Sequence, residues 1–163
     1  MMTFQTVLQL SYKCKHQVDW WVRNLSSLNG YPITKESSVT AFDFALASDA
    51  SDLGFFSYRV DSLQRAFSRP FSADESEESS TFKELTAIKD TWSRIDVLEE
   101  FRGKTVGHMT DSKYAVYILS VGSRNPRLQD LSLSVFLTLR KYRTRLITFM
   151  SQPKKIVRKK IWL

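Results

Sequence analysis

The chain has few of the residues that mark fibrous, secreted or membrane-spanning proteins. Its 163 residues include one cysteine, four prolines and five glycines, which excludes collagen-like and low-complexity sequences. The single cysteine, Cys14, cannot form a disulfide within the chain, as is usual in a reducing compartment. No run of 18 apolar residues is present, and the N-terminus lacks an apolar segment behind a basic start. We therefore expect no membrane span, no signal peptide and an intracellular protein, cytoplasmic or nuclear.

Acidic residues are also absent from residues 131–163, although this segment holds nine of the 24 lysines and arginines. The chain carries a formal net charge of +7, and the residues before 131 are close to neutral. The positive charge is therefore a property of the C-terminal segment. Such a segment attracts polyanions, of which nucleic acid is the most common. The alternative is a solvated basic tail that only aids solubility.

The remaining composition, 42% hydrophobic and 25% charged, is that of one globular domain with a short extra segment. Residues 1–38 predict a helical arm, in which the amphipathic pattern stops at the turn residues of the NGYP stretch. Residues 39–152 predict the main domain, and residues 153–163 a basic tail.

Period-two patterns predict the first strands of the main domain. In residues 40–51, bulky apolar side chains alternate with small or polar ones, which is typical of a strand. Short turns lead into two further strands, at 55–60 and 64–71, so the three form an antiparallel meander. We expect the polar, acidic residues 72–80 to form a solvated loop.

After this loop the apolar residues recur at helical spacing. Thr81, with Glu84 in the capping-box position, begins a helix that we expect to run to about Phe101. A strand comes next, then a helix capped by Asp111 or Ser112, a longer helix and a last strand, at 105–111, 112–120, 127–142 and 145–151. This order predicts an α/β fold: a mixed five-stranded sheet, with three antiparallel strands and then β-α crossovers, flanked by helices.

Three carboxylates lie at distinctive places in this predicted fold. Asp49 ends the first strand, Glu84 lies in the first turn of a helix, and Asp111 ends the fourth strand. If the first and fourth strands are neighbours, the three acids converge, and converging carboxylates repel unless a cation holds them together. Oxygen ligands suit Mg²⁺ or Mn²⁺, and two such ions can hydrolyse a phosphodiester. Taken singly, the three acids can also be a turn residue, a capping-box partner and an N-cap.

At these residues the sequence resembles the ribonuclease H domains of retroelement reverse transcriptases. The likeness covers about residues 17–150 and is carried by ASDASDLGFFSYRV, SSTFKELTAIKDTW, KTVGHMTDSKYAVYIL and GSRNPRLQDLSLSVF. It is greatest for the DIRS-like retrotransposons, which integrate through a tyrosine recombinase. In that group a DWW-bearing helical connection precedes the DAS strand, as VDWWVRNL and NGYPI do here.

The resemblance implies the ribonuclease H fold and hydrolysis of the RNA strand of RNA–DNA hybrids with Mg²⁺ or Mn²⁺. By motif, Asp49, Glu84 and Asp111 match the family's first three metal-binding acids, with Asp49 bridging two ions. The implied partners are the hybrid and the polymerase domain of a reverse transcriptase. The basic residues that we expect to contact nucleic acid are Lys113, Arg124, Lys154, Lys155, Arg158, Lys159 and Lys160.

The sequence also departs from that family. A fourth acid normally follows the last strand in a helix, whereas ITFMSQPKKIVRKKIWL contains none. Of the two histidines, His16 lies in the arm, and we expect His108 to be a packing or pairing residue inside the fourth strand. A non-catalytic nucleic-acid-binding or scaffold remnant of a reverse transcriptase therefore stays open beside the nuclease, as does a fragment without a role of its own. Trp92 is expected in the core.

Overall fold

The computed structural model describes residues 11–28, 42–60 and 62–151, which fall into two compact units. The first contains α1 (Tyr12–Leu28), a helix within the predicted arm, where the rings of Trp20 and Trp21 meet edge to face. The second unit, here called the body, contains the other described helices and the strands. The predicted boundaries after residues 38 and 152 lie outside the described residues, so the division into arm, domain and tail stays a prediction.

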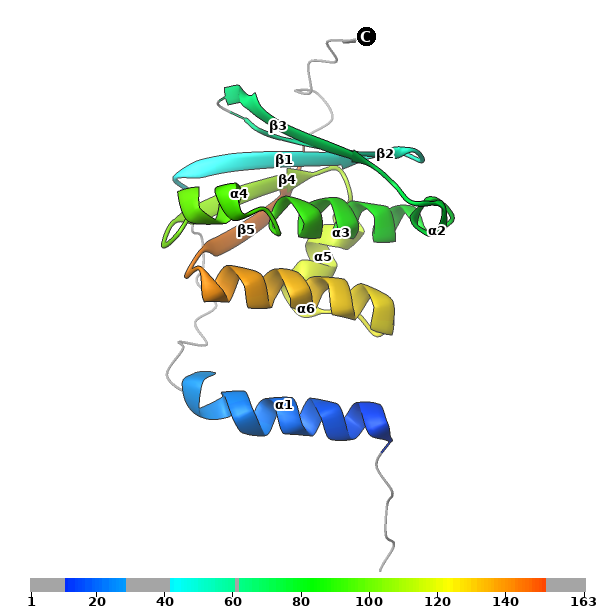
Figure 1. The fold of residues 1–163 in the computed structure, drawn as a ribbon, viewed down its shortest axis with the longest axis vertical. Helices are drawn as coiled ribbons and strands as arrows, with labels where there is room; N and C mark the ends of the chain where they lie inside the picture. Colours follow the sequence, from blue (N-terminus) through cyan, green and yellow to red (C-terminus); the bar gives the residue numbers. More distant parts are fainter. Residues whose placement is uncertain (1–10, 29–41, 61, 152–163) are drawn as a thin grey trace, which may run out of the picture. The chain divides into compact units, whose positions relative to one another are not determined.

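The body is built on one five-stranded sheet in the order β3-β2-β1-β4-β5 (Figure 1). β1 pairs antiparallel with β2, and β2 with β3, whereas β1–β4 and β4–β5 are parallel pairs. The strands are β1 (Phe44–Ala50), β2 (Gly54–Arg59), β3 (Ser62–Pro70), β4 (Thr105–Thr110) and β5 (Arg145–Met150). This arrangement confirms the predicted mixed sheet, including the pairing of the first and fourth strands.

Helices α3 and α6 lie on the same side of the sheet (Figure 1). The helices of the body are α2 (Ala73–Ser76), α3 (Ser80–Thr91), α4 (Ile95–Glu100), α5 (Lys113–Val121) and α6 (Pro126–Lys141). Between helices and sheet lies the main core, which contains Leu85, Ile88, Trp92, Val106, Val135 and Leu139. Trp92 is fully buried there, as its helical spacing predicted. None of the described helices is long and apolar enough to cross a membrane.

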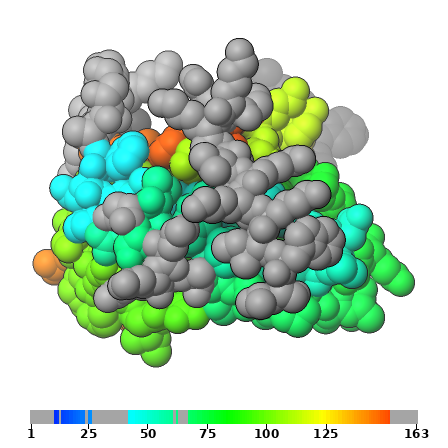
Figure 2. Space-filling model, turned by 90° about the horizontal axis from the view of Figure 1, so that it is seen from above, coloured from blue at the N-terminus to red at the C-terminus, as the bar shows by residue number. Residues whose placement is uncertain are grey.

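The opposite face of the sheet is seen in Figure 2, where residues of β1, β2 and β3 reach the surface in cyan and green. Gly107 lets two aromatic rings approach the backbone of β4. A Cβ at this position would come within 2.8 Å of the Phe149 ring and 3.0 Å of the Phe42 ring. These two rings stack with their centroids 5.4 Å apart.

Two details of the predicted helices are wrong. The single helix expected from Thr81 to Phe101 is divided into α3 and α4 by residues 92–94. At this break the hydroxyls of Thr91 and Ser93 bond back to the carbonyl groups four residues earlier, a contact that competes with the regular helical pattern. The start of α3 also differs, because Ser79 is its N-cap and accepts from the Phe82 amide.

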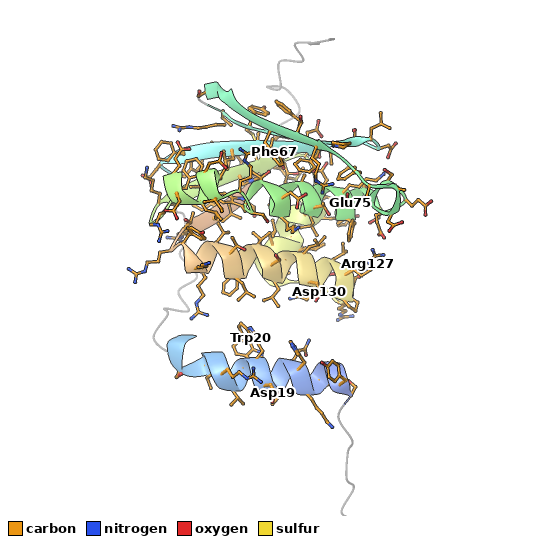
Figure 3. All side chains as sticks on the ribbon, viewed as in Figure 1. Asp19, Trp20, Phe67, Glu75, Arg127 and Asp130 are labelled. Atoms are coloured by element: carbon orange, nitrogen blue, oxygen red, sulfur yellow. The ribbon has the colours of Figure 1, made fainter. Side chains whose placement is uncertain are left out.

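The expected loop at 72–80 contains the one-turn helix α2. Ser72 caps it in a complete capping box with Glu75, the acid labelled in Figure 3. The Glu75 carboxylate also accepts two hydrogen bonds from the Arg69 guanidinium, at 2.7 and 2.9 Å. These bonds lower the pKa of Glu75 to about 2. The acidic stretch is thus tied to the end of β3 and is not a free loop.

Candidate metal centre

The parallel pairing of β1 and β4 determines where two of the predicted acids lie. Ala47 of β1 is in register with Met109 of β4. Two residues further along, Asp49 and Asp111 therefore reach the same edge of the sheet, at the carboxyl ends of their strands. Such an edge is where ligands of open α/β sheets bind. Both aspartates are exposed.

Helix α3 brings the third acid. It packs on β1 and β2, and Glu84 in its second turn is buried beside the ends of the two strands. One carboxylate oxygen from each of Asp49, Glu84 and Asp111 lies within 4.8 Å of the other two. The structure thus brings together the three acids that sequence spacing singled out, although they come from three separate elements.

Two donors fix the Glu84 carboxylate. The Ala50 amide donates to Oε1 at 3.0 Å, and the Thr110 hydroxyl donates to Oε2 at 3.1 Å. Thr110 is itself oriented, because its hydroxyl oxygen accepts from the Ser112 amide at 3.2 Å. Glu84 is therefore no part of a capping box, and Ser112, not Asp111, is the N-cap of α5.

Sequence reasoning missed Thr110. The signal was present, because Val106, His108 and Thr110 alternate along β4 and share the face toward the helices.

Burial and like charge raise the pKa of Glu84 to about 7. Desolvation is the largest cause, and the negative charges of Asp111 and Asp49 add to it, while the Ala50 amide opposes it. A cation among the three carboxylates would reverse the repulsive part of this balance. The all-oxygen ligand set fits a hard divalent ion such as Mg²⁺ or Mn²⁺, so the chain's own residues suit the metal that the sequence predicts.

Two nearby aspartates have other roles. Asp43, at the opposite end of β1, accepts a hydrogen bond from the Thr105 amide at 3.0 Å and joins the starts of β1 and β4. Asp52, in the turn between β1 and β2, pairs with the buried ammonium group of Lys83 at 2.8 Å. This contact lowers the pKa of Asp52. Neither residue belongs to the three-acid group.

His108 is confirmed as a buried pairing residue. Its Nδ1 accepts from the Trp92 indole N–H at 3.1 Å, and its Nε2 lies 2.8 Å from the Ser48 hydroxyl. Because Nδ1 acts as an acceptor, the neutral ring carries its proton on Nε2 and donates it to Ser48. Burial lowers the pKa of His108 to about 3, so the ring stays neutral near pH 7.

The basic residues expected to contact nucleic acid fall in two groups. Lys113 begins α5 and its ammonium group lies 5.1 Å from the centre of the Tyr114 ring, while Arg124 follows α5 in an exposed turn. Within residues 42–60 and 62–151, neither forms an ion pair. The other five, Lys154, Lys155, Arg158, Lys159 and Lys160, lie outside the described residues.

No protein-family model matches the chain, and no curated protein sequence matches it. Similar solved structures do exist. LC11 ribonuclease H1, obtained from compost by a metagenomic approach and solved with an RNA/DNA hybrid, matches with a TM-score of 0.59 and 12% identity, over 71% of this chain and 90% of that one. The N-terminal ribonuclease H domain of Rv2228c from Mycobacterium tuberculosis, fused to maltose-binding protein, matches with a TM-score of 0.53 and 11% identity, over 71% and 86%.

A longer protein also contains this fold. The foamy viral protease-reverse transcriptase, solved in complex with an RNA/DNA hybrid, matches with a TM-score of 0.53 and 10% identity. The match covers 82% of this chain and 24% of that one. At such low identity the likeness shows the fold alone: the body has the ribonuclease H fold.

Proposed function

We propose that the chain is a ribonuclease H of retroelement type, a metal-dependent hydrolase that cleaves the RNA strand of RNA–DNA hybrids. One observation carries the proposal. On a ribonuclease H fold, three carboxylates from separate elements converge within 4.8 Å at the carboxyl ends of two parallel strands. Gathering like charges costs stability, and a cation among them offsets this cost. We therefore interpret this cluster as a cation-binding site.

In this proposal Asp49, Glu84 and Asp111 hold two Mg²⁺ or Mn²⁺ ions. When bound, such ions supply an activated water and stabilise the leaving oxygen of a phosphodiester. The chain's own contribution is to present the ligands. The Ala50 amide and the Thr110 hydroxyl fix the orientation of Glu84, and the exposed carboxylates of Asp49 and Asp111 face the solvent from which a phosphate would approach.

The RNA–DNA hybrid is the substrate proposed from the fold and from the resemblance. Two of the similar structures were solved with such a hybrid. Recognition would rest on backbone shape and on the 2′-hydroxyl groups of the RNA strand, with little sequence preference. We also propose a DIRS-like element as the source, residues 1–38 as a connection to a polymerase domain, and residues 153–163 as a phosphate-binding tail.

A second function is favoured by one observation about charge. Residues 131–163 contain no acid, so this segment itself supplies no fourth carboxylate. A body that keeps the fold and the three acids but does not cleave nucleic acid would serve as a nucleic-acid-binding or scaffold module.

A cleavage assay distinguishes the two functions. The full chain is incubated with a hybrid labelled on its RNA strand, in Mg²⁺ and separately in EDTA, with a DNA–DNA duplex of the same sequence as the control. Cleavage of the RNA strand only, lost in EDTA and in Asp49→Asn, supports the nuclease. Tight binding of the hybrid without cleavage in Mg²⁺ contradicts the nuclease and supports the binding module.

A further inference from the structure

Helix α5 leads away from the three acids with a row of exposed side chains that the proposed chemistry does not use. Tyr114, Tyr117 and Val121 follow one another at helical spacing and are 60%, 64% and 64% exposed. The adjoining face of the helix buries Ala115 and Ile118 in the core. Two large aromatic side chains are therefore presented to the solvent by a helix that is packed along its neighbouring face.

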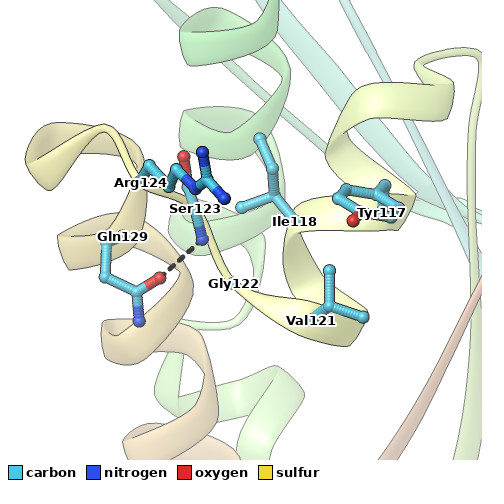
Figure 4. A pocket seen from close by; sticks show the side chains of 7 residues that line it. All are labelled: Tyr117, Ile118, Val121, Gly122, Ser123, Arg124 and Gln129. Carbon is cyan, nitrogen blue, oxygen red and sulfur yellow. Dashed lines mark hydrogen bonds between the residues drawn. The ribbon is translucent and has the colours of Figure 1, made fainter.

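The row ends in a hollow of about 590 Å³ between α5 and α6 (Figure 4). Tyr117, Ile118 and Val121 line it from α5, and Gln129 lines it from α6. The turn between the helices completes it with Gly122, Ser123 and Arg124. The lining of the hollow thus includes an aromatic ring, a guanidinium and an amide side chain, and its volume is within the usual size range of small-ligand sites.

Its polar side is preorganised. The Gln129 Oε1 atom accepts from the Ser123 amide at 2.7 Å, the bond drawn in Figure 4. Gly122 makes this possible, since a Cβ there would lie 2.8 Å from the same Oε1, and its φ of 85° disfavours other residues. With Oε1 occupied, the Nε2 amino group of Gln129 remains as a hydrogen-bond donor.

The charges beside the row select a polyanion as occupant. Lys113 and Arg124 lie at its two ends, and neither forms an ion pair within the described part of the body. The helix between them, KYAVYILSV, contains no acid. Exposed aromatic rings flanked by cations that form no ion pair are a combination that binds single-stranded nucleic acid, because any unpaired base can stack on a ring.

We propose that the hollow between α5 and α6 is a subsite for one unpaired nucleotide, with its base stacked on Tyr117 and its phosphate held by Arg124. Asp111 precedes α5, whose first residue is Lys113, and Tyr117 lies four residues along the helix from there, about 6 Å at 1.5 Å per residue. In this proposal the subsite holds a single-stranded end next to a hybrid bound at the acids. This inference rests on the proposed function for the identity of the polymer.

The test measures binding of a labelled single-stranded DNA, so it needs neither metal nor cleavage. A fluorescein-labelled 12-nucleotide oligo(dT) and a 12-residue abasic strand are titrated with the full chain in EDTA, by fluorescence anisotropy. We expect the chain to prefer oligo(dT) by about fivefold or more, the contribution of one stacked base. Tyr117→Ala should lose this preference, whereas Tyr117→Phe should retain it. Phe136→Ala, which removes an exposed ring from α6, is the matched control.

Salt dependence separates stacking from phosphate contact. Arg124→Ala should flatten the slope of log affinity against log salt by about 0.7, as expected for one cation on a single strand. Tyr117→Ala should leave that slope unchanged. The subsite is refuted if Tyr117→Ala prefers oligo(dT) as strongly as Phe136→Ala does, or if Arg124→Ala keeps the parent slope.

Two further outcomes distinguish the subsite from a protein contact and from the nuclease itself. If sedimentation shows a self-association that Tyr117→Ala abolishes while oligo(dT) binding is unchanged, the row is a protein contact and the subsite is wrong. A chain that cleaves hybrids and passes the Asp49→Asn test, yet shows no base preference, contradicts the subsite and leaves the nuclease intact. Base preference lost in Tyr117→Ala supports the subsite even where no cleavage is found.

Discussion

Two polar clusters lie next to each other on β1 and β4, and they are opposite in character. One is the buried chain of Ser48, His108 and Trp92, which is neutral and joined by hydrogen bonds at 2.8 and 3.1 Å. The other is the group of three carboxylates within 4.8 Å, of which two are exposed. Ser48 and Asp49 are consecutive residues of the same strand.

The difference shows how one pair of strands supports both stability and chemistry. In the buried chain each ring nitrogen of His108 has one partner, so burial is balanced by hydrogen bonds and the fold keeps the ring uncharged. In the acid group two donors hold Glu84, but burial, with two negative neighbours adding to it, raises its pKa. The first cluster is formed by hydrogen bonds between neutral groups, whereas the second gathers three carboxylates in an arrangement that could hold a metal ion.

The largest expected effect is a loss of RNA cleavage when a residue of the acid group is replaced. Asp111→Asn should lower the cleavage rate about a thousandfold, because a lost ligand removes several kcal/mol of metal stabilisation and each 1.36 kcal/mol is tenfold in rate. The melting temperature should not fall, since one like charge is removed. Gel assays on a labelled hybrid and thermal melts measure the two effects.

Asp43→Asn is the matched control for that experiment. It makes the same change of charge on the same sheet, and the new amide oxygen can still accept from the Thr105 amide. Its cleavage rate should stay within about twofold of the parent, as is usual for substitutions away from such features. Equal losses in both variants would show that net charge, and not metal ligation, controls the rate.

Substitutions in the buried hydrogen-bonded chain of Ser48, His108 and Trp92 should do the reverse: they should lower stability and leave cleavage almost unchanged. His108→Ala should lower the free energy of unfolding by about 3–4 kcal/mol, because it leaves a cavity and an unpaired indole N–H of Trp92. Cleavage per folded molecule should be almost unchanged. Urea denaturation and activity at low temperature measure these quantities. Lost cleavage without lost stability would mean that His108 takes part in the chemistry and that the two clusters are not separate.

The sequence predicted the acid group better than the buried chain. Asp49 and Asp111 follow from strand ends that alternation and turn residues make visible. Burial of Trp92 and His108 also follows from their patterns. The hydrogen bond between Trp92 and His108 could not be predicted from these patterns. It joins the end of a helix to a strand, and the position of the helix along the strand depends on the packing of the whole core.

Local ambiguity explains the remaining errors. Ser79, Ser80 and Thr81 are all good helix caps, so the sequence could not decide which one begins α3 or whether Glu84 serves a capping box. The break after Thr91 depends on side-chain hydroxyls bonding back to the helix, which a continuous helical pattern does not reveal. Capping by Ser72 and the contact with Arg69 likewise turned an expected loop into α2.

A pH titration in EDTA sharpens the comparison, because the clusters titrate with opposite signs. The pKa of Glu84 is raised from 4.5 to about 7, so its contribution to stability is lost as pH rises through this window, about 3 kcal/mol in all. The pKa of His108 is lowered from 6.5 to about 3, so its contribution is lost as pH falls below 6.5. Between pH 4.5 and 6.5 the two slopes oppose each other.

Glu84→Gln should therefore reveal the His108 slope alone. We expect the unfolding free energy of this variant to rise by about 1.4 kcal/mol per pH unit between pH 4.5 and 6.5, while the parent stays nearly level. Urea denaturation at half-unit steps of pH measures both profiles. Parallel profiles would show that Glu84 titrates as an ordinary exposed acid in the folded chain.

The smallest effect expected is the response of stability to metal, and it tests whether the acid group is a ligand site at all. With a dissociation constant of about 1 mM, Mg²⁺ at about 10 mM would stabilise the folded chain by about 1.4 kcal/mol, or about 3–5 °C in melting temperature. Asp49→Asn should remove most of this shift. Asp52→Asn should keep it, because Asp52 pairs with Lys83 outside the acid group. A shift that persists in Asp49→Asn would place the ions elsewhere, with the acids of residues 74–78 as the first site to examine. The acid group would then be as self-contained as the buried chain beside it, and the contrast between the two clusters would not hold.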